Sequence, residues 1–376
     1  MESETLPSPD DPCDRSGCSA DSSSDSGIDQ DGISEDSDFN PYRKPPLPYR
    51  VGFKFTANSH EAPLPSGVFD GINPPPKTKD WHLLSQTEYC LTDTVSTGNT
   101  RDSLSKELEI TSIIRIGSDR GAQLVVVNGN MVAKIYDPLY YSDTDGRFKQ
   151  DVLMAASGDY SRETAAYLHL QKSPAARKVI PTFWGSWTTV IATPIGALDQ
   201  RETHHRTVRM ILIEHLDGDC MYYVDPSEIR KRVRSRILEQ ALHAEAVICD
   251  AGVNHRDLHP RNIILLGPLY DSTEPTVKII DFNVAEVMEL VGKAKRPKKL
   301  KKLWPTQICS PIIRNYGSMG NFSAYGWCPD DEKEAEQWLW RHFKDDKQYY
   351  PVTWDPEPPF RRPRYQEDCV VGSVKN

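Results

Sequence analysis

The sequence lacks any apolar run of the roughly 18 residues that a membrane-spanning helix needs. Its first residues are acidic and polar, whereas a secretory signal peptide begins with basic residues and then an apolar stretch. The eight cysteines are scattered, with no Cys-x-x-Cys pair and no histidine spacing typical of zinc ligands. These absences argue against a membrane partner and a disulfide or zinc scaffold. We therefore predict a soluble cytoplasmic protein with reduced thiols.

Apolar residues are almost absent from residues 1–40, which contain ten serines, twelve acidic residues and a single basic one, Arg15. A segment of this kind buries too little surface to offset the entropy lost on ordering, so we predict a disordered acidic tail. The net charge of this tail is −11. Because the net charge of the whole chain is −9, the charges of all other residues sum to +2. Such a near-neutral balance gives no argument for specific nucleic-acid binding.

Residues 41–107 are predicted to be a proline-rich linker or extension. Residues 45–50 read Pro-Pro-Leu-Pro-Tyr-Arg, which fits the P-x-x-P-x-R pattern of polyproline II ligands. This pattern predicts an SH3-type partner, with an ordinary linker as the alternative.

A regular pattern of strands begins near residue 108. Apolar runs at 110–116, 123–127 and 131–136 are separated by a glycine-containing loop and by a tight Asn128-Gly129 turn, which predicts a meander of strands. Helical patterns follow at 161–171, at 331–343 and, most clearly, after Asp225, where Pro226 and Glu228 complete a helix start signal. The apolar stripe of that helix is Ile229, Val233, Ile237, Ala241, Ala244 and Ile248, and Gly252 ends it. A β-rich half followed by a helix-rich half predicts two lobes.

The chemistry-bearing motif is His-Arg-Asp-Leu-His-Pro-Arg-Asn at 255–262, which lies between the long helix and a predicted strand at 262–266. Asp281-Phe282-Asn283 follows one predicted hairpin later, after a strand at 277–280. Phosphoryl transfer needs metal ligands, a group that accepts or orients the attacking hydroxyl, and cations on the phosphates. We assign Asp257 as the catalytic base, and Asn262 and Asp281 as the ligands of Mg²⁺.

These segments resemble the catalytic and metal-binding loops of protein kinases. The likeness covers residues 108–352 and implies an α+β, bilobal protein-kinase-like fold, with a β-rich small lobe at 108–217 and an abbreviated helical large lobe at 218–352. The remaining residues 353–376 would be a C-terminal tail. The whole arrangement also resembles divergent kinase-like proteins of filamentous fungi, and the catalytic loop resembles aminoglycoside- and choline-kinase-like phosphotransferases.

The resemblance implies roles for residues before the catalytic loop. Lys134, in Val-Ala-Lys-Ile, would hold the α- and β-phosphates of ATP and pair with Glu163 on the following helix. The loop from Gly117 to Gly121 would cover the phosphates through its backbone amides, although its Asp119 is an unfavourable neighbour for phosphate. The Glu214 carbonyl and the Leu216 N–H would bind adenine.

The sequence also departs from the protein-kinase pattern. Asn283 replaces a glycine, and we expect it to adopt the left-handed backbone region that asparagine tolerates. His259 occupies the place of a lysine that contacts the γ-phosphate. Either it donates to the transferring phosphate when protonated, or it packs as a neutral ring that orients Asp257.

No Ala-Pro-Glu follows Asp281, which puts a peptide-docking platform in doubt, and residues 293–302 instead carry seven basic residues. This basic stretch is a solvated part of the loop or a nuclear-import signal, which leaves a nuclear location as the alternative to the cytoplasm. The leading hypothesis is an ATP- and Mg²⁺-dependent atypical serine/threonine protein kinase. A small-molecule phosphotransferase and a nucleotide-binding pseudokinase scaffold are the alternatives.

Overall fold

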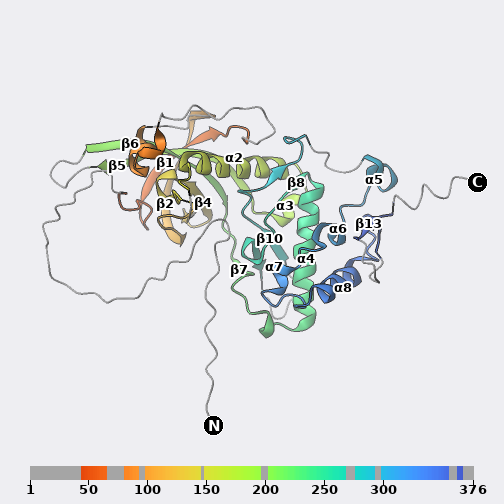
Figure 1. Ribbon diagram of the computed structural model, residues 1–376. Coiled ribbons are helices and arrows are strands. Elements are labelled where there is room, and N and C mark those ends of the chain that lie inside the picture. The colour runs from red at the N-terminus through yellow and green to blue at the C-terminus, as the bar shows by residue number, and fades with distance from the viewer. Residues whose placement is uncertain are drawn as a thin grey trace, which may run out of the picture.

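The computed structural model describes residues 44–65, 80–92, 98–144, 148–195, 202–267, 276–292, 298–354 and 362–366. It is a mixed α/β structure with a sheet-rich N-terminal part and a helix-rich C-terminal part (Figure 1). The predicted acidic tail 1–40 and most of the predicted tail 353–376 lie outside the described residues. Within the described ranges, no helix is long and apolar enough to cross a membrane.

Six antiparallel strands of the N-terminal part close into a barrel in the order β1-β2-β3-β4-β6-β5. Their bounds are Lys54–Glu61, Asn99–Arg115, Gln123–Val127, Met131–Tyr136, Phe183–Ile195 and Glu202–Glu214 for β1 to β6 in chain order. The predicted Asn128-Gly129 turn joins β3 to β4, and both residues have positive φ angles, of 52° and 78°. This conformation matches the twist of the paired strands.

The predicted start of the folded unit at residue 108 is too late. β1 pairs with β2 along its length and with β5 at Asn58 and Ser59, so it closes the barrel, and β2 begins at Asn99. The inward positions of β1 include Phe55 and Ala57, which are buried, but its other positions are largely polar. A strand with so few apolar positions gives a weak pattern, so its place depends on pairing with distant residues.

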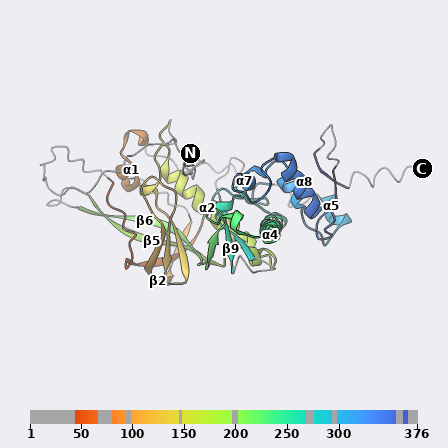
Figure 2. The same ribbon diagram turned by 90° about the horizontal axis from the view of Figure 1, so that it is seen from below.

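Two helices and two 3₁₀ turns accompany the barrel: η1 Trp81–Leu83, α1 Gln86–Thr92, η2 Pro138–Tyr140 and α2 Val152–Leu170. The short helix α3 Ala176–Val179 instead contacts α4 Lys231–Asp250 and β10 Thr276–Ile279 of the C-terminal part. The helix predicted at 161–171 is the second half of α2, which begins nine residues earlier because the Asp151 side chain accepts a hydrogen bond from the Met154 N–H. α2 contacts β4, β5 and β6 of the barrel and also β8 Val253–Asn254 and β11 Glu286–Val287 beyond it. It therefore joins the two parts of the molecule (Figures 1 and 2).

The C-terminal part is built around α4 Lys231–Asp250, with the short sheet β10-β9-β7 against it. Strands β7 Gly218–Cys220, β9 Ile263–Leu266 and β10 Thr276–Ile279 form that sheet, and β8 Val253–Asn254 pairs with β11 Glu286–Val287. The remaining elements are η3 Pro226–Glu228, η4 Pro260–Asn262, α5 Lys298–Leu303, α6 Pro311–Asn315, α7 Gly320–Ser323, α8 Glu332–Phe343, β12 Val352–Thr353 and β13 Arg364–Tyr365. Five residues of the basic stretch, 293–297, lie outside the described residues.

The predicted start of the long helix at Asp225 is wrong. Asp225 caps only the 3₁₀ turn η3, where its carboxylate accepts from the Ser227 N–H at 2.8 Å. The chain is extended at Ile229, whose side chain is buried, and α4 begins at Lys231. The predicted apolar stripe is nevertheless buried, and Gly252 ends the helix with a φ of 99°. The helix predicted at 331–343 is α8, whose buried face consists of Ala335, Trp338, Leu339 and Phe343.

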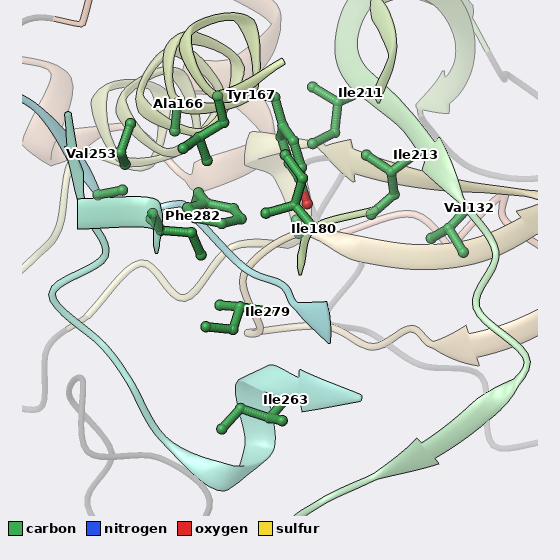
Figure 3. Packing of buried hydrophobic residues seen from close by; sticks show 14 of the residues in the cluster. Val132, Ala166, Tyr167, Ile180, Ile211, Ile213, Val253, Ile263, Ile279 and Phe282 are labelled. Atoms are coloured by element: carbon green, nitrogen blue, oxygen red, sulfur yellow. The ribbon is translucent and has the colours of Figure 1, made fainter. Parts of the chain in front are cut away.

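One apolar core runs through both parts of the molecule. Phe282 is completely buried and packs edge-on against Tyr167 of α2, with 5.1 Å between ring centroids (Figure 3). Tyr167 in turn stacks on Phe183 of β5 at 5.3 Å. Because Phe282 directly follows Asp281, this packing fixes the position of a predicted metal ligand relative to α2 and the barrel.

The segment from Lys44 to Arg50, called the strap below, packs on the barrel although it was predicted to be a linker. Tyr49 is buried, and its hydroxyl donates to the Asp137 carboxylate at 2.6 Å. The Tyr140 hydroxyl donates to the carbonyl oxygens of Pro45 and Pro46. Recognition of residues 45–50 by an SH3-type partner stays a prediction, and such binding would have to displace these contacts.

Asp137 beneath the strap has no exposed surface, and Arg206 of β6 is its charged partner, with 2.5 Å between Nη2 and Oδ2. We expect Arg206→Met to lower the free energy of unfolding by about 3 kcal/mol, because it leaves a buried carboxylate without its countercharge. Arg101→Met is the control, since Arg101 and its partner Glu61 are both exposed and such pairs contribute under about 1 kcal/mol. Equal losses for the two variants in urea unfolding would contradict this prediction.

Candidate functional site

Three charged side chains from distant parts of the chain meet between the barrel and the C-terminal part. Lys134 lies on β4, Glu163 on α2, and Asp281 follows β10. The Lys134 Nζ is 2.6 Å from Glu163 Oε2 and 2.5 Å from Asp281 Oδ1. The side chains of Lys134 and Glu163 are 6% and 1% exposed, whereas that of Asp281 is 30% exposed. The triad is thus buried at one end and open to solvent at Asp281.

The charges of the triad depend on each other. Burial alone would lower the pKa of Lys134, but the carboxylates of Asp281 and Glu163 outweigh it, and the net shift is upward. For Asp281, burial raises the pKa, but the Lys134 ammonium outweighs this effect and lowers it. Lys134 and Asp281 therefore stay ionised at neutral pH. This is the state that phosphate and metal binding require.

Tyr136, two positions after Lys134 on the same strand, was not predicted as a site residue. Its hydroxyl donates to Glu163 Oε2 at 2.7 Å, so that this oxygen accepts from both Tyr136 and Lys134. The other carboxylate oxygen, Oε1, is buried without a hydrogen-bond partner among the described residues. Tyr136 thus helps to fix the carboxylate that holds Lys134.

The catalytic loop holds Asp257 from two sides. Arg261 Nη2 donates to both carboxylate oxygens of Asp257, at 2.9 and 3.0 Å, and Asn262 Nδ2 donates to Oδ2 at 2.9 Å. Sequence reasoning missed Arg261, although its position four residues after Asp257, in the 3₁₀ turn η4, was a usable signal. With its Nδ2 turned to Asp257, Asn262 keeps Oδ1 as the atom for a metal ion.

Ile280 joins the catalytic loop to Asp281. The Ile280 N–H donates to the Asn262 carbonyl at 2.9 Å, and the Ile280 carbonyl lies 3.0 Å from Nε2 of buried His255. The Asp257 N–H donates to the other ring nitrogen of His255 at 3.3 Å. Burial lowers the pKa of His255, which keeps the ring neutral for this pair of contacts. Asp257, Asn262 and Asp281 therefore belong to one connected unit.

The left-handed residue after β10 is Asp281, with a φ of 66°, and the prediction of a left-handed Asn283 is wrong. The turn that follows is instead closed by a hydrogen bond from the Ala285 N–H to the Phe282 carbonyl at 3.0 Å. The Asn283 carbonyl accepts from Arg162 Nε of α2 at 2.5 Å. A positive φ at a residue other than glycine is strained, and such residues concentrate at functional sites.

His259 has the surroundings of a packed, neutral ring. Its Nδ1 accepts from the Arg261 N–H at 3.2 Å, and its ring lies against Tyr325 and Tyr222. Burial, together with the positive charge of Arg261, lowers the pKa of His259 to about 4. These observations favour the packing role over donation to phosphate.

The lowered pKa of His259 predicts acid sensitivity. A folded-state value near 4, below the unfolded value of about 6.5, means that the unfolded chain binds the proton more readily between these values. Stability from this group is therefore full above pH 6.5 and is lost as the pH falls toward 4. We expect His259→Asn, which keeps an acceptor for the Arg261 N–H, to reduce the stability loss between pH 7 and 5 by about 1 kcal/mol. Identical pH dependence of urea unfolding in both proteins would refute this.

The side chain of Gln123, a buried residue of β3, holds the glycine loop through hydrogen bonds. Gln123 was not predicted as a site residue. Gln123 Oε1 accepts from the Gly117 N–H at 2.7 Å, and its Nε2 donates to the carbonyls of Gly117 and Gly121. The Gly117 amide, predicted to face phosphate, is therefore already engaged. A Cβ at Gly121 would meet no atom within 4 Å, so open space adjoins the loop there.

The predicted adenine-binding residues lie where the barrel passes into the C-terminal part. The Glu214 carboxylate accepts from Thr182 and from Lys278 of β10, and so ties the two parts together. Burial raises the pKa of Glu214, but these hydrogen bonds outweigh it and lower the pKa. Leu216 is half-buried, and among the described residues none accepts from its N–H.

Within the described residues, no group of three or more His, Cys, Asp or Glu side chains is arranged to hold a metal ion. Asp281 and Asn262 offer one carboxylate and one amide oxygen. This donor set fits Mg²⁺, which protein sites hold through one or two carboxylates while phosphates and water complete the shell. When bound, ATP would supply the phosphoryl group, and Mg²⁺ would neutralise part of the negative charge of the phosphates.

No family model and no curated protein matches the sequence. Solved structures that match include WbdD, with 15% identity and a TM-score of 0.32, over 55% of this chain and 38% of WbdD. WaaP in complex with acyl carrier protein matches with 16% identity and a TM-score of 0.34, over 61% of this chain and 78% of WaaP. The chain thus spans well under half the length of WbdD. These values are too low to assign a fold family or an activity.

Proposed function

We propose that this protein is an ATP- and Mg²⁺-dependent phosphotransferase that acts on an alcohol hydroxyl. The observation that carries the proposal is the connected unit in which the Lys134–Glu163–Asp281 triad is joined through Ile280 to Asn262 and Asp257. It assembles a phosphate-binding cation, two metal ligands and a group that orients the acceptor. Phosphoryl transfer requires this set and little more covalent chemistry from the protein.

In this proposal each residue has a separate task. Lys134 holds the phosphates, kept in place by Glu163, while Asp281 and Asn262 hold Mg²⁺. Asp257 would accept a hydrogen bond from the attacking hydroxyl and take its proton as the new bond to the γ-phosphorus forms, while the bond from that phosphorus to the β–γ bridging oxygen breaks and ADP leaves. Glu214 and Leu216 offer a main-chain carbonyl and N–H to adenine. The bilobal protein-kinase-like fold inferred from the sequence belongs to the same proposal.

We further propose a small molecule as the acceptor rather than a serine or threonine in a protein. Between Asp281 and α8, the described chain contains the two-residue strand β11 and the short helices α5, α6 and α7. Asn321 of α7 donates to the Leu258 carbonyl of the catalytic loop, and Tyr325 packs on both His259 and Tyr222. The side chains of Asn321 and Tyr325 thus cover the catalytic loop next to Asp257. This arrangement supports a site that accepts a small molecule. A protein acceptor is the second candidate, since the basic residues of 293–302 suit an acidic peptide.

Purified protein with labelled ATP and Mg²⁺ tests the proposal. One series of assays contains aminoglycosides, choline-type alcohols and sugars, and the other contains a serine/threonine peptide library. Transfer to a small alcohol that disappears in the Asp257→Asn variant supports the proposal. Transfer to peptides alone assigns the protein-kinase alternative, and ATP binding without transfer to any acceptor assigns the pseudokinase alternative. The cytoplasmic or nuclear location stays a prediction.

A further inference from the structure

We infer that the strap is part of the nucleotide site and that its Lys44 is a positioning residue for the phosphates of ATP. In this view Lys44 offsets the charge of Asp119 in the glycine loop, so that the loop tolerates a polyanion beside it. The inference rests on the proposed function, because it concerns the same nucleotide.

The glycine loop contains a feature that should repel phosphate. Asp119 is 62% exposed and has a φ of 57°, which places a carboxylate at the turn of the loop. Lys44 Nζ lies 2.5 Å from its Oδ1, and the Lys44 side chain is only 25% exposed. The ion pair neutralises the local charge, and a phosphate beside it would meet a neutral pair rather than an anion.

Two backbone amides of the glycine loop are already engaged in hydrogen bonds within the protein. The Gly117 N–H donates to Gln123 Oε1, and the Arg120 N–H donates to the Tyr140 carbonyl at 3.1 Å. These two amides are committed to holding the loop in shape. Side-chain charge near the loop therefore has a larger share in phosphate binding than it would have in a loop with all of its amides free.

The contacts of the strap fix Lys44 in this place. Tyr140 contacts both segments, because its carbonyl accepts from Arg120 of the loop while its hydroxyl donates to Pro45 and Pro46 next to Lys44. Five positions after Lys44, the buried Tyr49 is bonded to Asp137. A lysine anchored so near a buried network loses less side-chain entropy on pairing than a mobile surface lysine does.

Affinities of ATP, ADP and adenosine, measured at low and high salt for the full chain, test this inference. We expect Lys44→Ala to weaken ATP binding about fivefold, ADP less and adenosine not at all, with the effect shrinking at high salt. Lys44→Arg should bind like wild type, and Asp119→Ala combined with Lys44→Ala should recover most of the loss. Arg50→Ala is the matched control, since it removes an exposed cation from the other end of the strap.

Each outcome of this experiment decides a point. Wild-type protein that binds ATP no better than Lys44→Ala, or an Arg50→Ala loss as large as the Lys44→Ala loss, overturns the inference and leaves the proposed function standing. Wild-type protein that binds no ATP in Mg²⁺ overturns both. A Lys44→Ala loss that is equal for ATP and adenosine means that the strap acts only on the fold, and it also overturns the inference.

Discussion

Asp281→Asn is expected to abolish the Mg²⁺-dependent part of ATP binding and to lower turnover about a thousandfold. Asp281 is the only carboxylate among the two proposed metal ligands, and a neutral amide cannot balance the charge of the ion. Metal ions contribute several kcal/mol of charge stabilisation in such reactions, and 1.36 kcal/mol corresponds to a factor of ten. The substitution keeps the size of the side chain, and Glu163 still neutralises Lys134 at 2.6 Å. The fold should therefore survive.

A fluorescent ATP analogue, titrated with Mg²⁺ and with a chelator, measures this effect. Wild-type protein should bind the analogue more tightly in the presence of Mg²⁺ than in the presence of the chelator. The Asp281→Asn variant should bind the analogue with the same affinity under both conditions. Asp217→Asn, at an exposed position between β6 and β7, is the matched control and should behave like wild type. An Asp281→Asn protein that is still stimulated by Mg²⁺ would show that the metal ligands lie elsewhere.

The site residues whose positions could be predicted from the sequence lie in short segments whose structure depends on neighbouring residues. Asp257 and Asn262 are five residues apart in one loop that ends in the 3₁₀ turn η4. Asp281 follows a strand that pairs directly with the one after Asn262. Lys134 could be placed because the Asn128-Gly129 turn fixes the register of β4 against β3. In each case the signal and the structure that it specifies are separated by few residues.

The features that could not be predicted depend on contacts between distant residues. β1 joins the barrel by pairing with β5, some 130 positions later. Tyr49 is buried because its hydroxyl bonds to Asp137 and its ring packs against Tyr140, both about 90 positions later in the chain. Gln123 and Tyr136 bear no recognisable motif, and their roles depend on where the glycine loop and Glu163 lie. The start of α4 was misplaced because a cap signal at Asp225 specifies a 3₁₀ turn equally well.

Asp257→Asn is expected to lower kcat about a thousandfold while the KM for ATP changes less than threefold. General-base groups contribute about 10² to 10⁴ in rate, and an amide cannot take a proton from the acceptor hydroxyl. Asparagine still offers one oxygen to Arg261, so the loop should keep its shape. This result differs from that for Asp281→Asn, where the Mg²⁺-dependent part of ATP binding is lost as well. Measuring kcat and KM separately therefore distinguishes the two roles.

Arg261→Met provides the comparison that separates proton acceptance from positioning. It removes the donor that lies 2.9 and 3.0 Å from the two oxygens of Asp257, but the Asn262 contact at 2.9 Å remains. Because the base is still present and only its orientation is loosened, we expect a loss in kcat of about tenfold. The exposed Asp219→Asn on β7 is the control for charge removal near the loop. If Asp257→Asn retained more activity than Arg261→Met, Asp257 would not be the base, and the acceptor would be oriented by another group.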